Sequence, residues 1–378
     1  MKLRSLVPIA LCAIGCAAAA WAQPPTRYQR TILTSDIPGA APNTDPVLSN
    51  AWGIAFNPSG SGSPFWIADN ATGCATLYDG TGVPQPTTTP KPLQVGIPLP
   101  GGSIPSTACK PAAPNTTTPA APTGLVFNST PAFLAGSTQA AFIFDTEDGT
   151  ISAWAPSLGT AAVLEVDESK ESPGGAVFKG LAFGTNGGDT FLFATNFRAG
   201  TIEVFAPGST GYQRVSLSDG AFTDPNLPPG YAPFGIHNIG GVLFVTYALQ
   251  NAAKHDDVAG QGHGFVDIWG TDGSLIQRFA QRGQLNSPWG VVRASMAFGD
   301  LSGLILVGNF GDGTINAYDN SGSFVGTVRD ASNKPLAIDG LWSLTLGGGK
   351  NSDSNTLYFT AGPDGETNGL FGTITPIQ

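Results

Sequence analysis

All three histidines of this chain fall in one stretch, and one of them is followed directly by two carboxylates. They are His237, His255 and His263, and Asp256-Asp257 follows the second of them. Histidine together with carboxylate is typical of general acid–base catalysis and of transition-metal binding. His255, Asp256 and Asp257 are therefore candidate catalytic residues, and convergence of His255 with His263 would suit a transition metal. The alternative is structural, with His255 and Lys254 pairing with the two aspartates to hold a long loop.

Oxygen-bearing side chains also recur after the second apolar run of four repeated units. These are Asp69, Asp145, Asn196 and Asn309, which we expect at equivalent places. Oxygen atoms from several units could together hold Ca²⁺, which takes six to eight such ligands. The sequence thus offers a calcium hypothesis. Considered one by one, each residue is explained equally well by a turn, because Asp and Asn commonly bond to their own backbone there.

Further charged residues occupy the same class of turn, and we take them as candidate ligand-binding residues: Glu147, Asp148, Arg198, Lys254 and Asp312. If these turns share one face of the molecule, that face is acidic and polar. It could bind a small molecule or a partner protein. The alternative is that adjacent carboxylates such as Glu147 and Asp148 are simply solvated.

The elements that must position these residues come from a repeat. Six units can be aligned on their first apolar runs, whose second positions are Gly53, Gly124, Gly180, Gly235, Gly290 and Ser343, spaced by 71, 56, 55, 55 and 53 residues. Each unit supplies several short strands separated by Gly-rich turns, and helical periodicity is scarce. This pattern predicts an all-β fold, a six-bladed β-propeller with four-stranded antiparallel blades.

The last unit ends after its third strand, and the N-terminal stretch offers the missing fourth. Tyr28 to Leu33 reads YQRTIL, which echoes YQRVSL at Tyr212 to Leu217. We therefore expect the N-terminal strand to complete the last blade and close the ring, hiding two strand edges.

The first 22 residues have the form of a signal peptide, with a basic start, an apolar run from Leu6 to Ala20, and a cleavage site after Ala22. A lipoprotein signal ending at Cys16 is the weaker alternative. The domain expected to fold is 23–378, with a Thr/Pro-rich insertion at 84–122. Cys74 and Cys109 bracket much of that insertion and are expected to form a disulfide in the periplasm or outside the cell.

Composition narrows the partners. The net charge of −10 argues against nucleic acid, and no later segment is apolar for long enough to cross a membrane. We expect a monomer that is not inserted in a membrane. None of the common catalytic fingerprints, such as GxSxG, HExxH or a P-loop, is present.

Several long motifs, above all KHDDVAG and NFGDGTINAYD, together with FIFDTEDGTISAW, resemble a family of exported bacterial proteins. The resemblance covers almost the whole chain except the Thr/Pro-rich insertion. It implies a six-bladed ring similar to NHL-repeat, strictosidine-synthase-like and gluconolactonase propellers, and it implies no particular reaction.

Three functions follow as hypotheses. The first is an exported propeller that binds a small ligand or a partner at its acidic channel mouth. The second is a Ca²⁺-dependent, lactonase-like hydrolase, in which the metal polarises a carbonyl or activates water. The third is a histidine-bound transition-metal site in the fourth unit.

Overall fold

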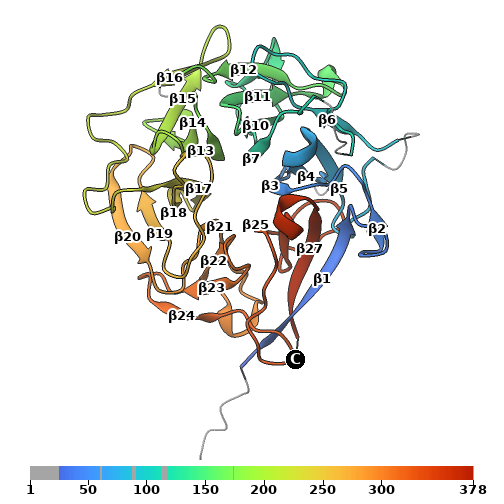
Figure 1. Cartoon of the computed structure of the whole chain (residues 1–378), viewed down its shortest axis with the longest axis vertical. Coiled ribbons are helices and arrows are strands. Elements are labelled where there is room, and N and C mark those ends of the chain that lie inside the picture. Colours follow the sequence, from blue (N-terminus) through green and yellow to red (C-terminus); the bar gives the residue numbers. More distant parts are fainter. Residues whose placement is uncertain (1–24, 60–61, 87–90, 112–116, 173, 378) are drawn as a thin grey trace, which may run out of the picture.

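The structure is a computed structural model, and it describes residues 25–59, 62–86, 91–111, 117–172 and 174–377. Six β-sheets are arranged as blades in a ring around a central axis (Figure 1). The expected all-β, six-bladed propeller with four-stranded antiparallel blades is confirmed. The predicted signal peptide lies outside the described residues.

The strands of each blade are given from the channel outward. Blade 1 has β3 (Ala51–Ala55), β4 (Phe65–Asp69), β5 (Cys74–Tyr78) and β6 (Gln94–Gly96), and blade 2 has β7 (Pro122–Phe127), β10 (Phe142–Thr146), β11 (Thr150–Trp154) and β12 (Val163–Asp167). Blade 3 has β13 (Phe178–Asn186), β14 (Asp189–Asn196), β15 (Thr201–Pro207) and β16 (Tyr212–Val215), and blade 4 has β17 (Tyr231–Ile239), β18 (Val242–Leu249), β19 (Phe265–Trp269) and β20 (Leu275–Gln281). Blade 5 has β21 (Pro288–Arg293), β22 (Ile305–Asn309), β23 (Ile315–Tyr318) and β24 (Phe324–Thr327), and blade 6 has β25 (Leu341–Leu346), β26 (Leu357–Ala361), β27 (Leu370–Ile377) and β1 (Arg27–Ser35).

The remaining elements are short. The two-residue β2 (Asn43–Thr44) runs parallel to β1, and β8 (Leu134–Ala135) pairs with β9 (Thr138–Gln139). Helical turns cover Asn70–Thr72, Pro156–Leu158 and Gly299–Leu301, and α1 covers Pro363–Glu366. No helix in the described part of the chain is both long and apolar enough to cross a membrane.

Glycines on the innermost strands let neighbouring blades approach closely. A Cβ atom built on Gly53 would lie 2.5 Å from the Thr123 carbonyl oxygen of blade 2, and one on Gly290 would lie 2.6 Å from that of Trp342 in blade 6. Real Cβ atoms do not come that close. The glycines that define the sequence repeat therefore allow the six inner strands to pack around a narrow axis.

The N-terminal strand closes the ring as expected, since β1 pairs antiparallel with β27 from Arg27 to Ser35. Tyr28 anchors this closure. It is 2% exposed, its hydroxyl donates to the Phe298 carbonyl oxygen at 2.9 Å, and its ring lies 4.8 Å from that of Phe298.

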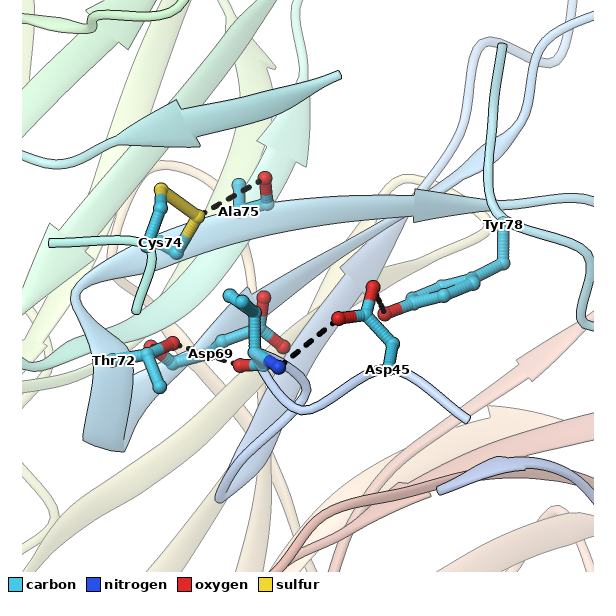
Figure 2. Close-up of a disulfide and its surroundings, with 8 residues drawn as sticks. Asp45, Asp69, Thr72, Cys74, Ala75 and Tyr78 are labelled. Atoms are coloured by element: carbon cyan, nitrogen blue, oxygen red, sulfur yellow. Dashed lines mark hydrogen bonds between the residues drawn. A yellow bond between two sulfur atoms is a disulfide. The ribbon is translucent and has the colours of Figure 1, made fainter. Parts of the chain in front are cut away.

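The Thr/Pro-rich insertion carries more order than its composition suggests. It contains β6, the outer strand of blade 1, which pairs with β5 from Cys74 to Thr76. The expected disulfide between Cys74 and Cys109 is present and joins the insertion to the start of β5 (Figure 2). A disulfide indicates an oxidising, non-cytoplasmic compartment.

We predict that Tyr28→Ala lowers the free energy of unfolding by about 3 kcal/mol, because it removes a buried ring and leaves a buried carbonyl without its donor. Urea denaturation measures this. Gln29 is exposed on the same strand, so Gln29→Ala is the matched control, with an expected change under about 0.5 kcal/mol. Equal effects of the two substitutions would show that this strand does not close the ring.

We predict that changing Cys74 and Cys109 together to serine costs about 4 kcal/mol, since the bond closes a loop with a sequence separation of 35. The native chain in dithiothreitol should fall to the same stability, whereas the double variant should not respond to the reductant. A reductant effect that persists in the variant would refute the assignment.

Candidate functional site

A polar network lies at the end of the channel where the innermost strands begin and the second strands end. At its centre is Lys179, the second residue of β13. The side chain of Lys179 is only 3% exposed. Its ammonium is ion-paired with the Glu147 carboxylate, from the turn between β10 and β11, and lies 3.7 Å from the Asp256 carboxylate. Blades 2, 3 and 4 therefore meet at one buried cation.

Two asparagines extend this network to blades 1 and 6. Asn70, just after β4, donates to Glu147 at 2.9 Å. Asn50 donates to the Asn70 side-chain oxygen at 3.1 Å and to the Glu366 carboxylate at 2.8 Å. We call this set the polar mouth: Asn50, Asn70, Glu147, Lys179, Asp256 and Glu366.

An aromatic cluster underlies the polar mouth. The Lys179 ammonium lies 5.2 Å from the Trp52 ring centroid, and Trp52 stacks on Trp342 with ring centroids 3.5 Å apart. Trp289 donates its indole N–H to the Lys179 carbonyl oxygen at 2.8 Å. These rings are almost fully buried, together with Phe197 and Phe234. A desolvated cation over a ring is favourable, so the cluster helps to hold Lys179 in place.

The carboxyl groups around the mouth differ in acidity. Burial raises the pKa of Asp257, and the nearby Asp256 charge adds to this effect. Burial likewise raises the pKa of Glu366, as it does for Asp148. Asp256 differs, because its hydrogen bond with His255 lowers its pKa. The site therefore combines an ionised carboxylate with carboxyls that give up their protons reluctantly.

Among the predicted catalytic residues, His255 and Asp256 contact each other, with His255 Nδ1 2.7 Å from Asp256 Oδ1. With Glu147 they form a group in which one ligand atom from each residue lies within 4.8 Å of the others, and the described part of the chain holds no other such group of His, Cys, Asp and Glu. His263 is not in this group. Its Nδ1 lies 2.9 Å from the Val258 carbonyl oxygen instead.

The four residues of the calcium hypothesis do not share one register. Asp69, Asn196 and Asn309 pair with the first residues of β3, β13 and β21, whereas in blade 2 the residue that pairs with the start of β7 is Thr146. Asp145 precedes it by one, so its side chain lies on the other face of the strand. The expectation of four equivalent places is wrong for Asp145.

Three of these side chains serve their own blades. Asp145 accepts hydrogen bonds from the Thr123 hydroxyl at 2.8 Å and from the Gly124 N–H. Asn196 and Asn309 accept from the backbone N–H groups of the preceding interblade links, at 3.2 and 3.1 Å. Asn196 and Asn309 therefore fix the links that lead into blades 3 and 5.

The fourth, Asp69, is fully buried, and neither of its carboxylate oxygens has a hydrogen-bond partner in the described structure. Burial raises its pKa well above the usual value. Figure 2 shows it near the disulfide, together with Asp45, which accepts a hydrogen bond from the Tyr78 hydroxyl at 2.9 Å.

Of the predicted ligand-binding residues, only Glu147 belongs to the polar mouth, with Asp148 adjacent to it. Arg198 donates to the carbonyl oxygens of Gly174 and Gly175. Lys254 is exposed in its loop, and Asp312 accepts bonds within its own turn.

Lys179 was not among the candidate site residues predicted from the sequence. A signal was present, because Lys179 precedes the repeat glycine of its unit, where four other units have Trp52, Phe234, Trp289 and Trp342. A single cation at an otherwise mostly aromatic position indicates a buried ion pair.

The fold and this site define a six-bladed propeller with an acidic channel mouth. The chain is 32% identical to uncharacterized protein R648 of Acanthamoeba polyphaga mimivirus over 358 residues, covering 93% of this chain and 81% of that protein. It belongs to the same family. Uncharacterized protein L690 of that virus is 29% identical, covering 89% and 83%. These relatives are viral, so they do not support the expected bacterial, exported family. No family model matches the chain.

Solved propellers resemble it more distantly. They include a streptogramin B lyase at 13% identity and a TM-score of 0.46, covering 93% of this chain and 98% of that one. A gluconolactonase from Xanthomonas campestris has 12% identity and a TM-score of 0.47, covering 88% of each chain. The aldose sugar dehydrogenase of Escherichia coli has 11% identity and a TM-score of 0.49, covering 93% and 100%. At these values, no residue role carries over.

We predict that Asp145→Asn flattens the pH dependence of stability. Burial raises the pKa of Asp145 to about 7, so the folded chain keeps a proton that the unfolded chain releases above about pH 4. This contribution to stability is complete below pH 4 and is lost as the pH rises to 7. The loss of unfolding free energy between pH 5 and pH 8 should be about 2 kcal/mol smaller in the variant. Identical profiles in urea denaturation would contradict this.

Proposed function

We propose that this protein binds a small cationic ligand at its polar mouth. The observation that carries the proposal is the surplus of acid there. Carboxyl groups from blades 2, 4 and 6, namely Glu147, Asp256, Asp257 and Glu366, interact electrostatically around the single ammonium of Lys179.

The charges favour a cation over an anion. Lys179 is already paired with Glu147, so it compensates only part of the surrounding negative charge. Glu147 and Asp257 both raise the pKa of Glu366 through repulsion, in addition to the effect of burial. A ligand cation would relieve this repulsion, whereas an anion would add to it. A primary amine fits this environment, because it is a compact point charge that can donate to several carboxylates.

A second candidate is a metal-dependent hydrolase, supported by the cluster of Glu147, His255 and Asp256. One imidazole and two carboxylates suit a transition metal such as Zn²⁺ or Mn²⁺ better than Ca²⁺, which prefers oxygen ligands. The bound metal would polarise a carbonyl or activate water. Against this candidate, the Lys179 ammonium already bridges the same two carboxylates.

We predict that putrescine raises the melting temperature of the protein and binds in isothermal titration calorimetry. Glu366→Gln should weaken binding at least tenfold, because it removes one charge while keeping an oxygen that accepts from Asn50. Asp189→Asn is the matched control and should not change the affinity. Asp189 is exposed at the start of β14, at the opposite end of the blades.

Metal ions are titrated in parallel. Stoichiometric Zn²⁺ or Mn²⁺ binding that is lost in His255→Ala but kept in Glu366→Gln would favour the hydrolase and justify an ester and lactone screen. Putrescine binding of equal strength in Glu366→Gln and the unmodified protein, or no binding at all, would overturn the cation proposal.

A further inference from the structure

The opposite end of the channel contains a cavity of about 430 Å³. Each blade contributes to the cavity the residue that follows the glycine, or Ser343, on which the repeats align. These residues are Ile54, Leu125, Leu181, Ile236, Val291 and Leu344. These six side chains are at most 9% exposed. One ring of aliphatic side chains therefore surrounds the channel, and the cavity has a size typical of small-molecule sites.

Aromatic side chains continue the wall toward solvent. Phe56, Phe127 and Phe183 lie two residues further along blades 1, 2 and 3, and all three line the cavity while remaining partly exposed. None of the described residues that line this cavity is an acid, a lysine or an arginine. An ionic ligand would lose its hydration here without compensation, so the walls suit an uncharged ring system.

His237 supplies a polar group in this apolar wall. Its counterparts in the other blades are Ala55, Val126, Ala182, Val292 and Thr345, so it is the one imidazole at this level. Its Nε2 lies 3.0 Å from the Trp289 carbonyl oxygen, and its ring packs edge-on against Trp289 with centroids 5.3 Å apart. Because a carbonyl only accepts, Nε2 carries the proton and Nδ1 is left as an acceptor.

That acceptor is available. Among the described residues, no group donates a hydrogen bond to Nδ1 of His237. Nδ1 is also not one of the fully buried polar atoms without a partner, so it remains accessible. Burial lowers the pKa of His237 to about 4, so the ring is neutral at physiological pH. Asn238, the next residue, uses its amide for the Phe183 carbonyl oxygen and the Gly241 N–H. A fixed, neutral acceptor thus stands in an apolar cavity.

We propose that this cavity binds a small, uncharged aromatic molecule carrying one hydrogen-bond donor, such as a phenol, with the donor on Nδ1 of His237 and the ring among the aliphatic and aromatic walls. This site is separate from the polar mouth, because the cluster of Trp52, Trp342 and Phe234 lies buried between the two ends. Trp289 connects them, since it donates to the Lys179 carbonyl oxygen and also lines the cavity.

The test uses a matched pair of probes on the full chain. Isothermal titration calorimetry compares 2-naphthol, which has a hydroxyl donor, with 2-methoxynaphthalene, which has the same rings and no donor. We expect one molecule of 2-naphthol to bind per chain, roughly tenfold more tightly than its methyl ether. The comparison needs no substitution, so misfolding cannot confuse it.

Variants then locate the site. His237→Phe keeps a ring and removes the acceptor, so both probes should bind it with similar affinity. Asp256→Asn, in the polar mouth, should leave both affinities unchanged. The proposal is overturned if neither probe binds the native chain, if the two bind it equally, or if His237→Phe, shown to be folded by circular dichroism, preserves the tenfold preference.

Discussion

The architecture depends on how closely the six innermost strands can approach one another. At Gly53 and Gly290, a side chain would collide with the backbone of the neighbouring blade. Five of the six repeat positions are glycine, and Ser343 is the exception. This close approach narrows the space around the axis. The residues directly before and after these glycines must then pack against one another there. The tryptophans and aliphatic residues next to the glycines therefore become the interior of the ring.

This geometry divides the channel into two chemical environments. The aromatic cluster fills its middle, with Trp52 stacked on Trp342 and edge-on to Trp289. On one side, turns and interblade links bring charged and amide side chains over the cluster, and Lys179 joins them. On the other side, the continuing strands present aliphatic side chains and one histidine. The two ends differ because turns carry the polar residues of this chain and the inner strands carry its apolar ones.

Buried polar groups tie neighbouring blades together. Asn196 and Asn309 bond the links that lead into their own blades, and the Thr195 hydroxyl donates to the Phe234 carbonyl oxygen of the next blade at 2.7 Å. Thr360 of blade 6 likewise donates to the Trp52 carbonyl oxygen of blade 1. Because a buried polar group is costly when unpaired, these bonds specify the order and spacing of the blades. Among the described residues, Asp69 is one of several buried side chains that make no such bond, and it lies near the disulfide (Figure 2).

The sequence by itself determined the repeat, the number of blades, the closing strand and the cysteine pair, because each is a local pattern or a count. Alternation of apolar residues, glycines at a fixed period and the echo of YQRVSL in YQRTIL require no knowledge of distant contacts. Only the tertiary structure decided the register of Asp145, since a one-residue difference reverses the face on which a strand places its side chain. It also decided that Lys179 meets Glu147, 32 residues earlier, and that the Thr/Pro-rich insertion carries the outer strand of blade 1. The identity of the partner of Lys179 follows from the packing of blade 2 against blade 3, and the local sequence around either residue does not specify it.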